Sequence, residues 1–245
     1  MARSDVLVII PARMGASRLP GKPLIDLAGE PMIVHVVRRA VAAQVGPVVV
    51  ATDSGAIATA VEKAGGRAVL TRADHASGSD RVHEAADIVD SERRAGIILN
   101  VQGDRPTQNP DDLRAALALL DDPAVDIGTI AGEILRPEDR DDPNVVKAVG
   151  TPVGPARLRA LYFTRATAPW GEGPLYAHAG LYAYRRAALE RFVRLPPSPL
   201  ERRERLEQLR ALEAGLRIDI ALVGSDLLDV NTPADLERAR ARLEG

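Results

Sequence analysis

The feature that most constrains the fold is an alternation of short β-branched runs with longer segments of helical period. Four runs in the first half predict strands over residues 6–10, 47–51, 68–70 and 97–101. Between them, apolar residues recur at three- and four-residue spacings, which predicts helices over residues 32–44, 56–64 and 80–91. This alternation is typical of βαβ units, so we predict an α/β fold with a Rossmann-like, mostly parallel sheet flanked by helices.

The second half of the chain alternates less regularly. Its predicted strands cover residues 126–133, 145–149, 158–163, 180–184 and 217–223, and they need not all be parallel. A helix is expected over 199–214, and a last helix begins where Thr232 can act as the N-cap and Pro233 as the first helical residue. Because the chain has no repeat or long linker, we predict one domain over 1–245, with halves of about 1–125 and 126–245 and a small, partly antiparallel subregion in the second.

Charge and composition exclude several classes of protein. The chain has 32 basic and 34 acidic residues, so no uniform field would attract it to nucleic acid or to an anionic membrane. Without cysteine it has neither disulfides nor thiolate metal sites. The apolar run over 6–10 is too short to span a membrane. We therefore expect a cytoplasmic protein that neither binds nucleic acid nor inserts into a membrane.

The loop after the first strand combines basic side chains with glycine and proline. Its three cations are Arg13, Arg18 and Lys22. A Walker A loop is excluded because five residues separate Gly15 from Gly21, and no Gly-x-Gly-x-x-Gly supports a nicotinamide site. Glycines alone would favour an ordinary surface turn. Ligands of doubly wound folds bind outside the carboxyl ends of the strands, however, which is where this loop lies.

Two further polar strings follow predicted strands. Residues 71–81 read Thr-Arg-Ala-Asp-His-Ala-Ser-Gly-Ser-Asp-Arg, and residues 100–104 read Asn-Val-Gln-Gly-Asp. Considered singly, Asp53, Ser79 or Asp80 could cap the helix that follows, and Asp104 could form a turn before Pro106. A carboxylate at this edge of the sheet also suits Mg²⁺, which prefers oxygen ligands and completes its coordination with water and phosphate.

Taken whole, these strings identify a family. The run Pro-Ala-Arg followed by Ser-Arg-Leu-Pro-Gly-Lys-Pro-Leu, together with residues 71–81 and 101–104, resembles the motifs of CMP-KDO synthetases, the 3-deoxy-manno-octulosonate cytidylyltransferases. Segments 142–147, 161–167, 178–185, 198–201 and 207–210 extend the resemblance through the second half. It implies a glycosyltransferase-A-like nucleotidyltransferase that transfers CMP from CTP to KDO for lipopolysaccharide synthesis, uses Mg²⁺ and forms a homodimer.

The same resemblance implies roles for individual residues. Catalytic roles fall on Arg13, Lys22 and Asp104. Nucleotide binding falls on Pro11, Ala12, Arg13, Lys22, Arg72, Ser77 and Gln102. Sugar binding falls on Gln102, Arg165, His178, Tyr182, Glu207 and Gln208, which offer the guanidinium and hydrogen-bonding groups that a carboxylated, polyhydroxylated sugar requires. The resemblance thus divides the chain into a nucleotide-binding first half and a second half for sugar binding and dimerisation.

One departure concerns the metal site. Where the family has Val-Asp-Thr-Pro, this chain has Val230-Asn231-Thr232-Pro233, so the implied second ligand to Mg²⁺ is an amide oxygen rather than a carboxylate. Our hypothesis is that Asp104 and Asn231 bind the metal, and that Asp229 restores negative charge through metal-bound water, because residues two apart in an extended segment point to the same side. Arg105 replaces a glutamate or apolar residue of many relatives and receives no role.

Two alternatives remain open from the sequence. The substrate could be a related acidic sugar such as 8-amino KDO. The segment between Trp170 and His178 is short for the family, so the loop beside the sugar pocket should differ in shape. The chain could also be a catalytically silent CTP-binding homologue, because Asn231 removes a charge from the metal site. A sialate-type synthetase is disfavoured by the Ser-Arg-Leu-Pro-Gly-Lys-Pro run.

Overall fold

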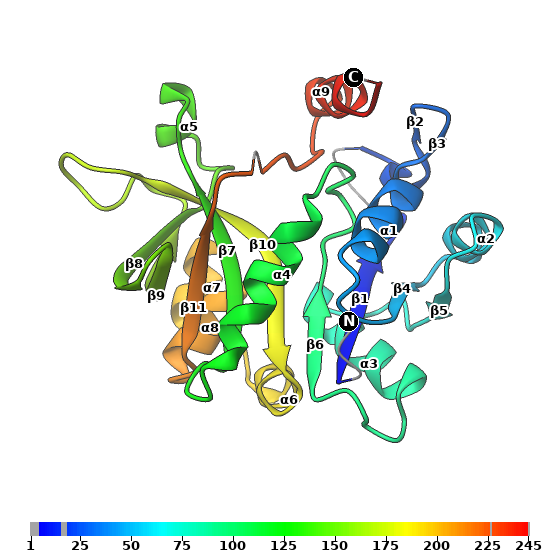
Figure 1. The fold of residues 1–245 in the computed structure, drawn as a ribbon, viewed down its shortest axis with the longest axis horizontal. Helices are drawn as coiled ribbons and strands as arrows, with labels where there is room; N and C mark the ends of the chain where they lie inside the picture. The colour runs from blue at the N-terminus through cyan, green and yellow to red at the C-terminus, as the bar shows by residue number, and fades with distance from the viewer. Residues whose placement is uncertain (1–4, 16–18, 226, 245) are drawn as a thin grey trace. The chain divides into compact units, whose positions relative to one another are not determined.

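The computed structural model describes residues 5–15, 19–225 and 227–244 of the chain (Figure 1). Arg18, one of the three predicted cations of the first loop, lies outside these residues. The chain forms two compact units, the first from residues up to 113 together with those from 228 onward, and the second from residues 114–227. The C-terminal segment therefore belongs to the first unit.

The first unit contains four parallel strands in the order β5-β4-β1-β6. Their bounds are β1 (Val6–Ala12), β4 (Val48–Thr52), β5 (Ala68–Leu70) and β6 (Ile97–Asn100). Val8, Ile9 and Ile10 of β1 have no exposed surface, as expected for the central strand of a sheet with both faces covered. The predicted parallel βαβ arrangement is confirmed.

Helices of the first unit start at well-formed caps. They are α1 (Met32–Ala42), α2 (Gly55–Lys63), α3 (Gly78–Val89) and α9 (Pro233–Glu244), with the short η1 (Lys22–Leu24) and the β2 (Asp26–Leu27) and β3 (Glu30–Pro31) hairpin. Ser54 caps α2, and Ser77 caps α3 in a capping box with Asp80. The caps thus differ from the alternatives that the sequence left open, Asp53 for α2 and Ser79 or Asp80 for α3. Thr232 accepts a hydrogen bond from the backbone N–H of Asp235, as its predicted N-cap role requires.

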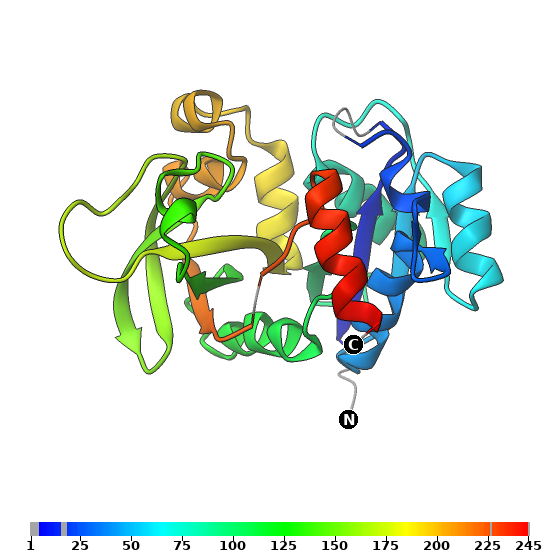
Figure 2. The ribbon, with the colours of Figure 1, turned by 90° about the horizontal axis from the view of Figure 1, so that it is seen from above.

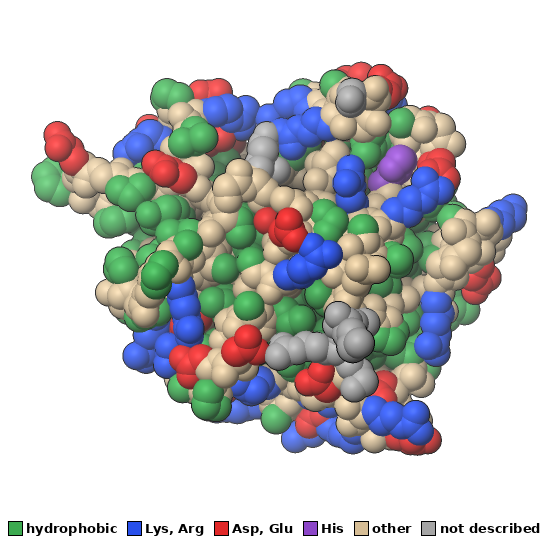
Figure 3. Space-filling model, viewed as in Figure 1, with side chains coloured by type: hydrophobic (Ala, Val, Ile, Leu, Met, Phe, Trp, Pro, Cys, Tyr) green, Lys and Arg blue, Asp and Glu red, His purple; other side chains and the backbone are tan. Residues whose placement is uncertain are grey.

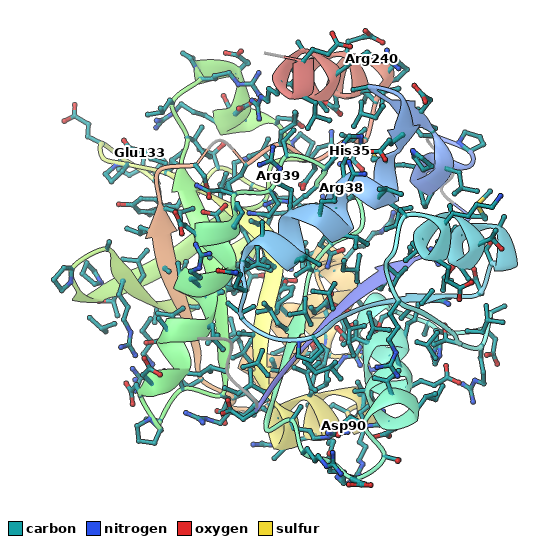
Figure 4. All side chains as sticks on the ribbon, turned by 45° about the vertical axis from the view of Figure 1, so that its right-hand side comes forward. His35, Arg38, Arg39, Asp90, Glu133 and Arg240 are labelled. Atoms are coloured by element: carbon teal, nitrogen blue, oxygen red, sulfur yellow. The ribbon has the colours of Figure 1, made fainter. Side chains whose placement is uncertain are left out.

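The C-terminal segment packs into the first unit through its own small core. Leu228, Val230 and Ala239 form a buried cluster with Leu27 and Met32. Figure 2 shows α9 as the red helix, and Figure 4 labels Arg240 on it. The guanidinium of Arg240 donates a hydrogen bond to the carbonyl of Asp26 in β2 over 3.1 Å. These contacts fix the position of the residues that precede α9.

The second unit is built on a mixed sheet in the order β10-β7-β11-β9-β8. Its strands are β7 (Ile127–Glu133), β8 (Lys147–Gly154), β9 (Arg157–Thr164), β10 (Tyr176–Arg185) and β11 (Ile218–Val223). Strand β11 is parallel to β7, whereas the pairs β10–β7, β11–β9 and β8–β9 are antiparallel. This confirms the predicted antiparallel content of the second half and the mixed α/β class.

The helices of the second unit correct the sequence prediction at two places. The expected helix over 199–214 is two helices, α7 (Pro199–Glu204) and α8 (Gln208–Glu213), because Arg205 between them adopts a left-handed conformation with φ of 57°. Helix α6 (Arg186–Arg194) was not predicted, since its charged residues hide a narrow apolar stripe of Ala188, Leu189 and Phe192. The remaining elements are η2 (Leu119–Asp121) and α5 (Pro137–Asp141), while α4 (Pro110–Ala118) spans the boundary between the units.

Apolar side chains also reach the surface of the second unit. Figure 3 shows hydrophobic side chains in green over strands β8 and β9, where Val153 and Leu161 are exposed.

No described helix combines the length and the apolar character that crossing a bilayer demands.

Candidate active site

A cavity of about 370 Å³ lies at the carboxyl ends of β1 and β6 in the first unit. Eight predicted site residues line it: Pro11, Ala12, Arg13, Lys22, Ser77, Gln102, Asp104 and Asn231. They come from four separate stretches of sequence: three follow the parallel strands β1, β5 and β6, and the C-terminal segment supplies Asn231. The cavity thus lies where ligands of doubly wound folds bind.

The ammonium group of Lys22 makes the densest set of contacts described in the lining of this cavity. Its Nζ donates to Asp104 Oδ2 over 2.9 Å, to the carbonyl of Val230 over 2.7 Å and to Asn231 Oδ1 over 3.2 Å. Asp104 is further fixed by its backbone carbonyl, which accepts from the N–H of Val230 over 3.0 Å. Three oxygens from the loop after β6 and from the C-terminal segment therefore surround one cation.

Glycines allow the backbone to approach this cluster closely. Gly21 adopts a left-handed conformation with φ of 69° immediately before η1, and so turns the chain to present Lys22. At Gly103 an added Cβ would lie 2.8 Å from the carbonyl oxygen of Pro11, so a side chain there would force the loops after β1 and β6 apart.

The segment between β5 and α3 supplies another wall of the cavity. Ser77 lines it while its hydroxyl accepts from the N–H of Asp80 at the start of α3. His75 also lines the cavity, and its side chain is hydrogen-bonded to the carboxylate of Glu84. Burial opposes ionisation of Glu84, but the hydrogen bonds from the His75 side chain and the Arg72 backbone N–H lower its pKa below the ordinary value. Arg72 itself is exposed, pairs with Asp74 over 3.1 Å and does not line the cavity.

Arg81, in the first turn of α3, connects this segment to the ends of two strands. Its side chain is buried, and it donates to Asp53 Oδ2 over 2.8 Å and to Thr71 Oγ1 over 2.6 Å. Asp53 follows β4 and Thr71 follows β5, so Arg81 joins two strand ends to α3. The aspartate that the sequence treats as a candidate helix cap is therefore half of a partly buried ion pair.

Asp229 and Arg105 form a third ion pair near the cavity. The buried guanidinium of Arg105 donates to Asp229 Oδ1 and to Gln108 Oε1, the latter over 3.3 Å. Partial burial raises the pKa of the Asp229 carboxyl, and Arg105 offsets part of that rise. Asp229 does not line the cavity, whereas Asn231 does.

The second unit places Arg165 at the end of β9. Its Nε donates to the carbonyl of Glu204 over 2.9 Å, and its NH1 donates to the carbonyl of Pro143 over 2.8 Å. The Glu204 carboxylate accepts from the backbone N–H of Arg165 and from Thr164 Oγ1. Neutral carbonyls orient the guanidinium without neutralising it, which keeps its charge available for an anion.

The remaining predicted sugar-binding residues lie in β10 and at the start of α8 in the second unit. The rings of His178 and Tyr182 in β10 lie 5.5 Å apart. Burial raises the pKa of Tyr182 strongly, with further contributions from Tyr184 and from Glu207, which adjoins Gln208 at the start of α8. The structure thus brings the rings of His178 and Tyr182 together, with Glu207 near enough to act on the Tyr182 hydroxyl. Tyr182 and Gln208 are both buried.

Comparison with known proteins identifies the family. A model described as "Cytidylyltransferase" matches residues 7–218. The chain belongs to the cytidylyltransferase family. This cytidylyltransferase is 64% identical over 245 residues to the 3-deoxy-manno-octulosonate cytidylyltransferase of Rhodopseudomonas palustris (strain HaA2), with 100% of both chains covered. It is 65% identical over 240 residues to the protein of that name from Azorhizobium caulinodans, covering 98% of this chain and 96% of the relative.

Solved structures agree with this assignment. A CMP:2-keto-3-deoxy-manno-octonic acid synthetase complexed with CTP has a TM-score of 0.89 and 41% identity, with 98% of this chain and 99% of that one covered. A 4-diphosphocytidyl-2C-methyl-D-erythritol synthase from Anaerococcus prevotii has a TM-score of 0.65 at 13% identity, and so shares the fold. The resemblance of this cytidylyltransferase to the CMP-KDO synthetases is confirmed.

Sequence reasoning left three residues of this cytidylyltransferase without a role. Arg81 and His75 line the cavity, and Arg105 pairs with Asp229. Arg105 is next to Asp104, and Asp229 is two residues from Asn231. Because both segments contribute to the predicted metal site, their opposite charges could have been predicted to pair. Arg81 and its partner Thr71 stand at the two ends of the 71–81 string, but neither the string nor the more distant Asp53 indicated that the three side chains meet.

Proposed function

We propose that this chain transfers CMP from CTP to 3-deoxy-D-manno-octulosonate, forming CMP-KDO and pyrophosphate for lipopolysaccharide synthesis. The observation that carries the proposal is the Lys22 ammonium held among Asp104, Val230 and Asn231 in the cavity of a cytidylyltransferase. Attack of the sugar hydroxyl on the α-phosphorus of CTP increases negative charge on the phosphate oxygens and on the departing pyrophosphate. Cations fixed at that point lower the barrier.

The donor atoms around Lys22 suit a magnesium ion. The oxygens that the ammonium contacts belong to a carboxylate, an amide and a carbonyl, all of which are ligands that Mg²⁺ accepts. No group of three or more His, Cys, Asp or Glu residues suited to a metal occurs in the described part of the chain, so phosphate and water would complete the coordination. We assign Asp104 and Asn231 as the residues that would hold Mg²⁺. When bound, it would draw charge from the phosphate oxygens.

The residues of the chain itself account for binding and orientation. Arg13 and Lys22 balance charge on the triphosphate, and Ser77 with the start of α3 contacts the nucleotide, with Gln102 beside the reacting groups. In the second unit, Arg165 binds the sugar carboxylate, while His178, Tyr182, Glu207 and Gln208 bind its hydroxyls. Holding the two reactants in register supplies much of the rate enhancement, because a bimolecular step becomes effectively unimolecular.

The decisive experiment is a pyrophosphate-release screen of the purified chain with four nucleotides and several acidic sugars. Release with CTP, KDO and Mg²⁺ is expected. A higher kcat/KM with 8-amino KDO would reassign the sugar, and CTP binding without release with any sugar would overturn the proposed activity.

The metal assignment needs its own test. Asn231→Ala should raise the Mg²⁺ concentration required for half-maximal turnover, and Asp229→Ala should do so to a smaller extent, because Asp229 is already paired with Arg105. Direct Mn²⁺ binding, measured by electron paramagnetic resonance in the presence of CTP, should weaken in parallel. We would abandon the assignment if neither variant changed the metal dependence.

We also propose that the protein is a cytoplasmic homodimer that works as a single nucleotidyltransferase domain. The second unit has large apolar side chains that such an interface could cover, among them Leu161 and the fully exposed Trp170. Sedimentation equilibrium should give twice the mass of 26.2 kDa. Cell fractionation tests the location.

A further inference from the structure

A buried lysine begins β8 in the second unit. The side chain of Lys147 has no exposed surface. Burial lowers the pKa of its ammonium group below the ordinary value of 10.5, although the charges of Asp142, Asp141 and Asp139 oppose the decrease. Lysine is rarely buried to this extent, because its ammonium group loses the hydration that an apolar side chain would not need. None of the proposed substrate contacts uses this residue.

The ammonium group holds the turn that precedes β8. Nζ of Lys147 donates to the carbonyl of Asp142 over 2.7 Å, and the same carbonyl accepts from the N–H of Val145 over 3.1 Å. The Asp142 carboxylate accepts from the backbone N–H of Asn144 over 2.8 Å and from its side-chain amide over 3.0 Å. The turn over residues 142–146 is thus closed by its own hydrogen bonds and tied to the strand by Lys147.

The same turn holds the side chain of Arg165. NH1 of Arg165 donates to the carbonyl of Pro143 over 2.8 Å, directly next to the carbonyl that Lys147 contacts. Strands β8 and β9 pair Lys147 with Thr164, so the turn and Arg165 lie just beyond one pair at the same end of the two strands. Lys147 and Arg165 therefore contact consecutive carbonyls of one short segment.

Two carbonyls on separate segments determine the orientation of the Arg165 guanidinium. Nε donates to the carbonyl of Glu204, and NH1 donates to that of Pro143. Because the guanidinium is planar and rigid, fixing Nε and NH1 also fixes the direction of the remaining N–H groups. Glu204 is held by the bonds of its carboxylate to Thr164 and to the Arg165 N–H, whereas Pro143 depends on the turn. Displacing the turn would therefore release one side of the guanidinium.

The far end of the turn contacts another predicted sugar-binding residue. The carbonyl of Val146 accepts from the backbone N–H of His178 in β10 over 2.8 Å. The segment that Lys147 holds thus touches Arg165 at one end and His178 at the other.

We propose that Lys147 is a positioning residue: by holding the Asp142 carbonyl it fixes the turn over 142–146, and so directs the Arg165 guanidinium toward the carboxylate of the acidic sugar. The inference rests on the proposed function, in which Arg165 binds that carboxylate. Lys147 acts only through Arg165, so its loss should weaken recognition of the sugar and leave recognition of the nucleotide unchanged.

Nuclear magnetic resonance tests the positioning without any substrate. In ¹⁵N-arginine-labelled protein, with Arg165→Gln for assignment, the rate of rotation of the Arg165 guanidinium reports whether NH1 is held. Lys147→Met, which keeps a similar length and removes the donor, should make this rotation several-fold faster. Lys63→Met, at an exposed lysine of α2, is the matched control and should leave the rate unchanged. An unchanged rate in Lys147→Met would overturn the proposal.

A second variant loosens the same turn from a partly exposed position. Asp142→Ala removes the carboxylate that accepts from Asn144 and should also speed the rotation, by a smaller factor. Lys147→Met should fold, because the Asp142 carbonyl keeps the Val145 N–H, and circular dichroism checks this. If Lys147→Met does not fold, Asp142→Ala decides, and an unchanged rate in that variant would overturn the proposal.

A double-mutant cycle tests the consequence for the sugar. Lys147→Met should lower kcat/KM for KDO about tenfold, with the KM for CTP unchanged. In the Arg165→Gln background the same substitution should have less than about a twofold further effect, because the contact it supports is already absent. Equal fold losses in both backgrounds would show that Lys147 acts independently of Arg165 and would refute the proposal. Absence of pyrophosphate release in the wild type would instead refute the proposed function and leave the rotation measurement to decide the positioning.

Discussion

The first unit joins its candidate residues through charge, whereas the second joins them through rings and neutral hydrogen bonds. Lys22 meets Asp104, Arg81 meets Asp53 and Arg105 meets Asp229 around the cavity. In the second unit Thr129, His178 and Tyr182 meet through a hydroxyl and ring contacts. Phosphate transfer requires charge stabilisation, and recognition of a polyol requires directed donors and acceptors. The difference indicates that changes in the first unit should alter kcat and changes in the second should alter the KM for the sugar.

The strongest test of this comparison is Asp104→Asn. The substitution keeps the shape but removes the carboxylate that Lys22 contacts, so we expect kcat to fall by about 10²–10³, the range for losing one transition-state contact. Pyrophosphate release at saturating CTP and KDO measures it. Asp74→Asn, at an exposed residue outside the cavity, is the control and should be within twofold of wild type. A fall in kcat below threefold for Asp104→Asn would contradict the assignment.

The matching test in the second unit is Arg165→Gln. Loss of the proposed charge-assisted contact to the sugar carboxylate should lower kcat/KM for KDO by about 10²-fold, equivalent to roughly 2–3 kcal/mol, with the KM for CTP unchanged. Arg159→Gln, an exposed arginine on the same strand, is the control. The comparison between the units fails if the KM values for CTP and KDO rise together.

A third test asks whether charge also stabilises the first unit. Arg105→Met leaves Asp229 and Gln108 without their buried partner and should lower the free energy of unfolding by about 1–3 kcal/mol, because an unpaired polar group then remains. Urea denaturation measures the loss. Combining it with Asp229→Asn should recover part of the stability, and strictly additive effects would show that the pair is not coupled.

The smallest expected effect tests whether the second unit contains any stabilising ion pair. Burial opposes ionisation of Glu201, yet hydrogen bonds from Arg210 and the Ser198 N–H lower its pKa below the ordinary value of 4.5. A lowered carboxyl pKa stabilises the fold above the unfolded-state pKa, and this contribution disappears as the pH falls through the folded-state pKa. Glu201→Gln should therefore cost about 1 kcal/mol at pH 7 and less near pH 3. Glu172→Gln, at an exposed residue, should show no such difference.

Much of the first unit could be predicted because its signals are local. Each strand is a short apolar run, and topology alone places the residues after it at one edge, which is how Arg13, Lys22 and Asp104 were found. Thr232 was recognised as a cap from its own neighbours. The roles of these residues came from the family motifs, and the substrate came from there as well.

The features that were not predicted depend on contacts between distant segments. The Arg105–Asp229 pair spans 124 residues, and Thr129 meets His178 across 49. The break between α7 and α8 depends on a left-handed arginine, which sequence pattern does not favour because such a conformation is rare outside glycine. Helix α6 was missed since charge dominates its composition.

The return of the C-terminal segment to the first unit has a consequence for biosynthesis. Val230 and Asn231 complete the oxygen cluster around Lys22, and Leu228 and Val230 fill the small core with Leu27. Chains fold from the N-terminus as they leave the ribosome. A nascent chain can therefore form the four parallel strands long before it can complete the oxygen cluster around Lys22. On the proposed function, we expect catalytic competence only when residues 228–239 have emerged, and we expect prematurely terminated products that fold to be inert.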